Sequence, residues 1–282
     1  MKSQYEAKSL SQRGMALIAV LWIVAVLGII VTSMGQSVRN EVRLVSGARE
    51  SVVANALGDA AIHIVLQDLA ARTEPVAALT RTEVPYQGRT ITVEVMPLNG
   101  LIDINKAPQE LLASLFGIGA HMPPDVAAGL AQATVETRSR KSASGREEGF
   151  DAPEDLLRVP GLDYTVYANI SRLITADRPG SGKVNPMAAP EGVLAVLADG
   201  NAARASSISN DRDSNRPGID TTSLTAAFID NTATKLLRIQ AKVSLPSGAT
   251  LLVARSVDLS DGVRDGLPWR TFHVEQRFEP GR

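Results

Sequence analysis

The side chains best suited to binding a metal lie in one short polar segment, Asp211-Arg-Asp-Ser-Asn215. Asp211, Asp213 and Asn215 stand at alternate positions, as the oxygen ligands of calcium-binding loops do. The pattern then departs from such a loop, because an arginine replaces the turn glycine and a threonine replaces the bidentate glutamate. A flexible polar loop over residues 201–218 is therefore the favoured interpretation. Calcium is the alternative, and no other cofactor is expected.

Catalytic chemistry has little support in the sequence. The chain contains no cysteine, which excludes disulfide bonds and thiolate metal sites. No nucleophile elbow or phosphate-binding loop is present, and the three histidines fall in separate segments without ligand spacing: His63, His121 and His273. We therefore expect a protein that is not an enzyme, with His63 on a surface and His273 in a structural role.

The N-terminal region indicates a membrane location. No charged side chain occurs from Gly14 to Val38, and at about 1.5 Å per residue a helix of this length crosses a bilayer core of roughly 30 Å. Basic residues precede the segment at Lys2, Lys8 and Arg13. This excess of positive charge predicts a single span with a cytoplasmic N-terminus, so that the chain beyond Arg39 lies outside the cytoplasm.

The residues in front of this segment suggest how it is processed. Arg13-Gly14-Met15, the end of a short basic leader followed by an apolar run, resembles the signal of type IV prepilins. That resemblance implies cleavage by prepilin peptidase between Gly14 and Met15, and N-methylation of Met15. Two alternatives stay open. One is a plain anchor that is never cleaved, and the other is a secretory signal, for which Ser33-Met-Gly35 is a poor cleavage site.

Helical periodicity continues beyond the apolar segment. Apolar residues recur at steps of three and four, charged residues take other positions, and no proline occurs before Pro75. The pattern predicts one helix from Met15 to about Leu69, apolar in its first half and amphipathic in its second. Its expected buried stripe consists of Val38, Val42, Val45, Ala48, Val52, Ala56, Ala60 and Ile64.

Strand signals lie in two distant parts of the chain. Residues 89–96 alternate between polar and apolar types and predict a first strand. Near the C-terminus, residues 237–245 and 250–257 flank the turn Pro246-Ser-Gly248 and predict a hairpin. Residues 269–278 predict a last strand, at a sheet edge. A long pilin-like helix with a small antiparallel sheet is an α+β fold.

Between the two strand regions, residues 98–232 are predicted to be mainly helical, and similar helix-start motifs recur within them. Proline marks three expected helix starts, near Ala-Pro108, Ala-Pro153 and Ala-Pro190, and Asn105 is a candidate cap for the first. Two of these helices are followed by glycine-containing hairpins, Phe116-Gly-Ile-Gly119 and Val159-Pro-Gly-Leu162. The insert therefore resembles helix-hairpin-helix or sterile-alpha-motif-like units.

Helix-hairpin-helix units often bind DNA, so a DNA-engaging minor pilin of a competence or pilus system is the alternative function. From Leu98 to Gly200 the sequence has nine Lys/Arg against thirteen Asp/Glu, whereas phosphate binding requires a positive surface. Glycines that close tight helix–helix turns are the favoured interpretation. Nucleic acid is accordingly not an expected partner.

Together, the prepilin-like leader, the long helix, the insert with Asn105-Lys-Ala-Pro-Gln-Glu-Leu-Leu112 and the C-terminal strands resemble the general secretion pathway protein K family. These are the K-type minor pseudopilins of the type II secretion system. The resemblance covers the full length and implies a subunit at the tip of a periplasmic pseudopilus, in a complex with I- and J-type minor pseudopilins. It also implies a bacterial inner-membrane anchor, a periplasmic head, and contact with secreted substrate or with the outer-membrane channel.

Ala19 agrees with a place at the tip. Counting from Met15, Ala19 is the fifth mature residue, where most pilins carry a glutamate that pairs with the N-terminus of the preceding subunit. A carboxylate in lipid is costly, so it is retained where a partner is available to neutralise it. A tip subunit has no preceding subunit, so an apolar residue is expected at this position. The expected organisation is a leader (1–14), a transmembrane half-helix (15–38), an amphipathic helix and first strand (39–97), a helical insert (98–232) and C-terminal strands (233–282).

Overall fold

The computed structural model describes residues 9–141, 145, 147–176, 180–214, 216–260 and 266–279. Within the first helix, side chains are described for residues 17–28 and from residue 47 onward. The chain divides into two compact units, Met1–Ala54 and Asn55–Arg282, and each is described by itself.

The first unit is helical. Helix α1 runs over Ser9–Ala71, which confirms the predicted long helix and extends it at both ends. Every described apolar side chain between Leu17 and Leu27 is exposed, including Leu17, Leu21 and Trp22, each at 67–70%. A helix surface that is apolar on all sides and exposed to water is unfavourable in a soluble protein, because each such side chain gains about 1.5–3 kcal/mol by burial.

Two apolar stretches of α1 differ in burial. By length and composition, Gly47–Ala71 is the one described stretch long enough to cross a membrane, whereas Leu17–Gly28 is shorter. However, 44% of the most apolar part of Gly47–Ala71 is already buried inside the protein. We therefore assign its Asn55–Ala71 portion to the core of the second unit, and not to a membrane.

The buried face of α1 in the second unit is not the predicted stripe. Ile64 is 42% exposed and Ala56 is also exposed, so the expected stripe is wrong over the described side chains of this unit. The helix instead buries the neighbouring face, which carries larger side chains: Leu57, Ala61, Ile62, Val65, Leu66 and Leu69. Both faces repeat at helical spacing, and the one with more leucine and isoleucine gains more from burial.

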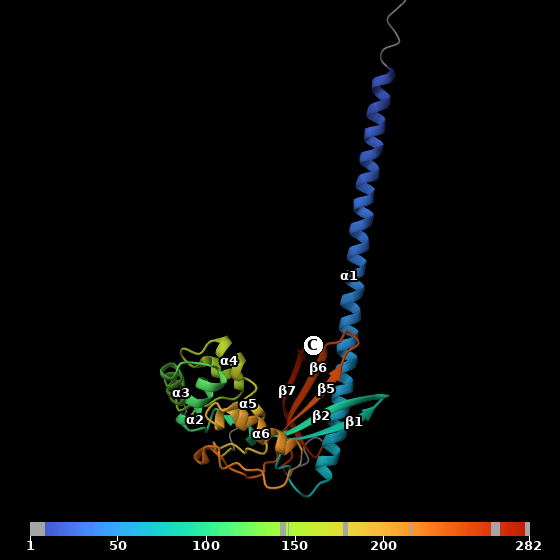
Figure 1. The fold of residues 1–282 in the computed structure, drawn as a ribbon. Coiled ribbons are helices and arrows are strands. Elements are labelled where there is room, and N and C mark those ends of the chain that lie inside the picture. Colours follow the sequence, from blue (N-terminus) through green and yellow to red (C-terminus); the bar gives the residue numbers. More distant parts are fainter. Residues whose placement is uncertain are drawn as a thin grey trace, which may run out of the picture. The chain divides into compact units, whose positions relative to one another are not determined.

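The second unit contains a five-stranded antiparallel sheet in the order β1-β2-β5-β6-β7 (Figure 1). Its strands are β1 (Thr80–Tyr86), β2 (Arg89–Pro97), β5 (Leu236–Ser244), β6 (Thr250–Asp258) and β7 (Arg270–Glu279). The predicted hairpin is β5–β6, and the predicted last strand is β7 at an edge. Strand β1 was not predicted. It pairs with β2 through a two-residue turn in which Gln87 and Gly88 have positive φ, as such hairpins require.

Helix α1 packs on one face of this sheet. Gly58 permits the close approach, since a Cβ there would lie 2.8 Å from a methyl group of Val253 on β6. Next to it, Arg255 on β6 forms an ion pair of 2.5 Å with Asp59 on α1. Apolar packing and this charged contact thus hold the Asn55–Ala71 part of α1 against β5 and β6.

The helices between β2 and β5 share one apolar core, with Leu111, Phe116 and Ile170 fully buried. They comprise α2 (Gln109–Ser114), η2 (Leu115–Gly119), α3 (Pro124–Arg138), η3 (Pro153–Arg158), α4 (Tyr164–Ile170), α5 (Glu191–Leu197) and α6 (Ala202–Asp213), with short helices η1 (Leu98–Gly100) and η4 (Ala226–Phe228). Strands β3 (Ile102–Asp103) and β4 (Ile174–Thr175) form a small parallel pair. The predicted α+β class is confirmed.

Two local predictions are wrong. Asn105 does not cap a helix, because α2 begins after Pro108. Residues 201–218 are not one flexible loop, because α6 occupies most of them. The Asn201 side chain caps α6 by accepting a hydrogen bond from the Arg204 amide, and Ala205 and Ile208 bury one side of an otherwise polar helix.

Candidate functional site: the junction of helices and sheet

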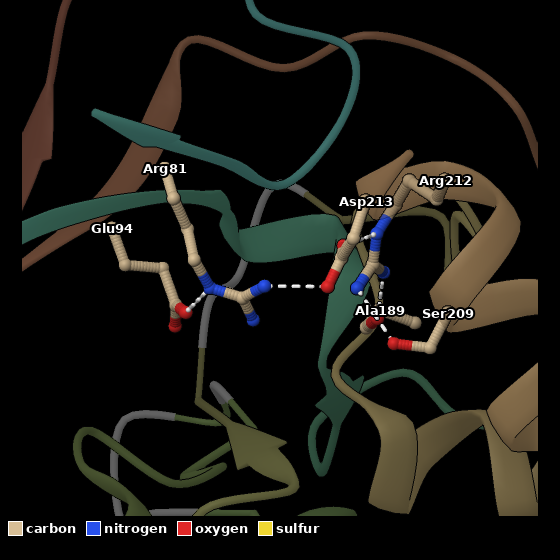
Figure 2. Close-up of polar contacts among 6 residues, drawn as sticks. All are labelled: Arg81, Glu94, Ala189, Ser209, Arg212 and Asp213. Carbon is tan, nitrogen blue, oxygen red and sulfur yellow. Dashed lines mark hydrogen bonds and ion pairs between the residues drawn. The ribbon is translucent and has the colours of Figure 1, made fainter. Parts of the chain in front are cut away.

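A chain of charged side chains joins α6 to the sheet. It consists of Glu94 on β2, Arg81 on β1, and Asp213 and Arg212 at the end of α6, and we call it the charged junction (Figure 2). The Arg81 guanidinium donates to Glu94 at 2.8 Å and to Asp213 at 2.5 Å. Because Arg81 and Asp213 are 132 residues apart, this contact ties two remote parts of the chain together.

Arg212 is the buried member of the junction, with only 3% of its side chain exposed. Its guanidinium donates to the Asp213 carboxylate at 3.0 Å, to the Ala189 carbonyl at 2.5 Å and to the Ser209 hydroxyl at 3.1 Å (Figure 2). A buried charge is tolerated when it is paired and hydrogen-bonded in this way. Arg212 therefore also fixes the segment that leads into α5.

The junction shifts the protonation equilibria of two of its members, Asp213 and Arg81. Burial alone would raise the pKa of Asp213, but hydrogen bonds from Arg81 and Arg212 outweigh it and lower that pKa below its usual value. For Arg81, burial alone would lower the pKa of the guanidinium. The carboxylates of Asp213 and Glu94 outweigh this effect and raise that pKa. Both shifts favour the charged forms of Asp213 and Arg81, and the ion pair between these two residues holds α6 to the sheet.

Two asparagines connect further segments that are remote in the sequence, Asn105 within the insert and Asn185 between the insert and the segment before β1. The Asn105 amide donates to the carbonyls of Phe150 and Ala176, both at 2.9 Å, and its oxygen accepts from the Phe150 amide at 2.8 Å. Asn185 is 1% exposed and donates to the Ala77 carbonyl at 2.8 Å. Each asparagine side chain thus forms hydrogen bonds with backbone groups of loops, which have no partner in a strand or helix.

The glycines of the two predicted hairpins have packing roles. A Cβ on Gly119 would lie 3.0 Å from a methyl group of Leu173, so this glycine allows close contact with the end of α4. Gly161 has a φ of +84°, a conformation that favours glycine in the turn before α4. These positions agree with the favoured interpretation that the glycines close tight helix–helix turns.

The predicted calcium ligands are not brought together. Asp211 and Asp213 both lie on α6, two residues apart, and so point to different sides of the helix. Asp211 pairs with Arg216 at 2.6 Å, Asp213 belongs to the charged junction, and Asn215 lies outside the described residues. Among the described residues, no group of three acidic, histidine or cysteine side chains gathers as a metal site would require.

The remaining predicted residues lie apart from the junction. Gly14 and Met15 belong to α1, but their side chains are outside the described residues, while Ala19 is exposed on α1. His63 is exposed, as predicted, and its ring meets Trp269 edge-on at 6.0 Å. His121 lies in a turn with a φ of +58°, and His273 is half-buried on β7.

The sequence reasoning missed the charged junction entirely. Arg212 stands in a run of polar residues that gives no sign of burial, and the partners of Arg81 depend on the fold. Asn105 and Asn185 had a usable signal, because each begins a repeated segment in which alanine and proline follow shortly after. For Asn105 the pattern predicts helix capping, whereas both asparagine side chains reach loops that are remote in the sequence.

Comparisons with known proteins give a structural resemblance. No protein-family model matches the sequence, and no curated protein matches it. A similar solved structure is a chain in the crystal structure of the GspK-GspI-GspJ complex from the enterotoxigenic Escherichia coli type 2 secretion system. The two chains are 13% identical, the match covers 85% of this chain and 98% of that chain, and the TM-score is 0.49. Similarity at this level carries no inference about function.

Proposed function

We propose that this protein is a minor pseudopilin of a type II secretion system, which acts structurally at the tip of the pseudopilus. The observation that carries the proposal is the division of α1 into two parts. A charge-free, exposed apolar part follows Arg13-Gly14-Met15, and the part from Asn55 to Ala71 forms the core of a small sheet domain. A helix that is both an anchor and a core element suits a subunit that is pulled from a membrane into a fibre.

The proposed processing follows from the leader. Prepilin peptidase cuts between Gly14 and Met15, Met15 becomes the N-methylated first residue, and residues 15–38 anchor the subunit in the bacterial inner membrane. Ala19, the fifth mature residue, keeps this part of the helix apolar. A glutamate there would have to be held in lipid at a cost of about 2.5–3.5 kcal/mol until a partner neutralised it. A subunit without a predecessor avoids that cost.

The proposed organisation places the head in the periplasm. The C-terminal part of α1 and the strands form the pilin-like domain, and the insert over residues 98–232 gives the head its bulk. The charged junction makes the insert and the sheet one unit, which is useful for a cap that must transmit force from the fibre below. The I- and J-type minor pseudopilins are the proposed partners, and secreted protein is the proposed contact. Calcium is not needed for this role.

The mature N-terminus tests the proposal. The full-length protein is expressed with and without prepilin peptidase, and the N-terminus is determined by intact mass and peptide sequencing. We expect a chain that starts at Met15 only when the peptidase is present. Gly14→Leu should abolish the cut, whereas Gly28→Leu, a matched change inside the apolar segment, should leave it intact.

Other outcomes would reject the proposal. A chain that starts at Met1 in both cases would be a plain anchored protein, and a cut beyond Val31 would mark a secretory signal. Binding of duplex DNA by the full-length protein in detergent at physiological salt, if it fell steeply with added salt, would instead support the DNA-engaging minor pilin. Each result assigns the protein to a different class.

A further inference from the structure

A groove of about 530 Å³ separates one face of the sheet from η3 and α4 of the insert. Its sheet side includes Arg238 on β5 and Phe272 on β7, and its insert side includes Leu157 and Tyr164. The buried apolar core of the insert contains no described residue of β6 or β7, so it does not fill this space. Ligand-binding clefts in proteins commonly measure about 300–1,000 Å³.

Three large apolar side chains that are exposed to solvent line this groove. Leu157 on η3 is 40% exposed, Tyr164 at the start of α4 is 72% exposed, and Phe272 on β7 is 43% exposed. A single exposed apolar side chain is ordinary on a protein surface. Three of them, from separate elements and on one concave surface, are typical of an interaction site. The groove therefore offers an apolar contact to a binding partner.

Arginine side chains outnumber their carboxylate partners beside β7. Glu275 is shared by Arg238 and Arg277, and Glu279 is shared by Arg277 and Arg172. The contacts of Arg172 and Arg277 are 3.4–3.9 Å long, whereas a strong charge-assisted hydrogen bond measures about 2.7–2.9 Å. The Nε–H groups of Arg238 and Arg277 are buried and have no acceptor among the described residues. Donors therefore exceed acceptors on this side of the groove.

The wall formed by η3 and the residues just before it has the opposite charge. Asp151 and Glu154 line this wall, and Glu154 accepts a hydrogen bond from the Tyr167 hydroxyl. Burial and the neighbouring Glu154 carboxylate raise the pKa of Tyr167, so the hydroxyl remains a donor at neutral pH. An anionic group in the groove is thus repelled by the η3 wall and attracted to the arginines beside β7.

We propose that this groove binds a segment of a partner protein in which an acidic side chain stands beside an aromatic or large aliphatic one. The carboxylate accepts hydrogen bonds from Arg172 and Arg277, whose side chains are 63% and 32% exposed. The neighbouring side chain packs against Tyr164 and Phe272. Charge complementarity selects the acid, because a third carboxylate would equal the number of guanidiniums. A polypeptide is the occupant because neighbouring residues of one chain supply both contacts.

Recognition of an acidic segment goes beyond the proposed function, since it gives the head a binding site of defined chemistry. The groove lies in the second unit and involves neither the leader nor the apolar segment of α1. Binding in the groove can therefore fail while cleavage after Gly14 succeeds, and the reverse.

Binding of short peptides to the full-length protein in detergent micelles tests the groove. The probe is a fluorescent pentapeptide with leucine, phenylalanine and glutamate at its centre. Matched peptides carry glutamine or lysine for the glutamate, or alanine for the phenylalanine. Fluorescence anisotropy gives each Kd after binding to empty micelles is subtracted. We expect the glutamate peptide to bind about tenfold more tightly than the lysine peptide and about fivefold more tightly than the alanine peptide.

Substitutions show whether the groove is the binding site. Arg277→Gln should weaken binding of the glutamate peptide about fivefold and leave the glutamine peptide unchanged. Arg270→Gln, at an exposed position of β7 outside the groove, should affect neither peptide. Tyr164→Ala should weaken both peptides about threefold, whereas Val126→Ala, at an exposed position of α3, should not. Thermal unfolding confirms that each variant is folded before the Kd values are compared.

Several results would overturn the proposal. The first is equal binding of the glutamate and lysine peptides, and the second is no binding of the glutamate peptide at about 1 mM. Equal losses for Arg277→Gln and Arg270→Gln would place the binding site outside the groove, as would equal losses for Tyr164→Ala and Val126→Ala.

Discussion

The two edge strands of the sheet, β1 and β7, differ in their contacts with the rest of the protein. At the β1 edge, Arg81 is engaged by Glu94 and by Asp213 of α6, and Pro85 removes a backbone donor from the strand. At the β7 edge, the strand is longer, contains no proline and exposes Val274 and Phe278. The comparison indicates that the β1 edge is engaged inside the protein, and we call it the closed edge. No described strand lies beside β7, and we call this the open edge. Four substitutions would break or sharpen this difference.

Removal of the buried arginine should have the largest effect. Arg212→Met keeps much of the side-chain volume but leaves the Ala189 carbonyl, the Ser209 hydroxyl and the Asp213 carboxylate without the buried donor. We expect a loss of about 3 kcal/mol in the free energy of unfolding, measured by urea denaturation. Arg204→Met, at an exposed position of the same helix, should change it by less than about 0.5 kcal/mol. Equal losses for both would mean that the junction does not stabilise the closed edge.

Asn185→Ala should have the second-largest effect on stability. Asn185 is buried and bonds the Ala77 carbonyl just before β1, so its removal leaves backbone groups unsatisfied near the closed edge. We expect a loss of about 2 kcal/mol in the same measurement. Asn210→Ala, an exposed asparagine on α6, is the control and should be near neutral. If Asn185→Ala were neutral too, the asparagine would not carry this contact.

Acidification should weaken the closed edge through Asp213. The junction lowers the pKa of Asp213 below its ordinary value of 3.8, so the stabilisation is complete above that value and is lost as the pH falls through the lower, folded-state pKa. Asp213→Asn should therefore be less stable than the natural protein at pH 7, by about 1 kcal/mol because the group is partly exposed. The difference should shrink towards zero in acid unfolding below pH 3.8. A constant difference at all pH values would exclude this linkage.

Substitution at the open edge should affect folding least. Val274→Lys places a charge at an exposed position of β7, and we expect a change of less than about 0.5 kcal/mol in the free energy of unfolding. Thr82→Lys, at an exposed position of β1, is the matched control and should change the free energy of unfolding equally little. A large loss of stability from Val274→Lys would show that β7 is not an open edge.

Local patterns predicted the elements with strong periodicity. The long helix, the β5–β6 hairpin and the last strand follow from residues that are close in sequence, so their signals need no tertiary contact. Strand β1 was not predicted, because its turn has Gln87 where asparagine or aspartate marks such hairpins and because Pro85 interrupts the strand pattern. The flexible loop was predicted where α6 lies, because the polar surface of this helix hides the burial of Ala205 and Ile208.

The sequence by itself determined the apolar segment, the leader pattern of Arg13-Gly14-Met15 and the α+β class, because these depend on composition and short-range spacing. Only the tertiary structure decided which face of α1 is buried, since two adjacent faces carry apolar side chains and the sheet accepts the one beside Gly58. It alone decided that Asp213 meets Arg81 and that Arg212 is buried. Charged residues find their partners through the packing of remote elements, and that packing is settled by the core around them.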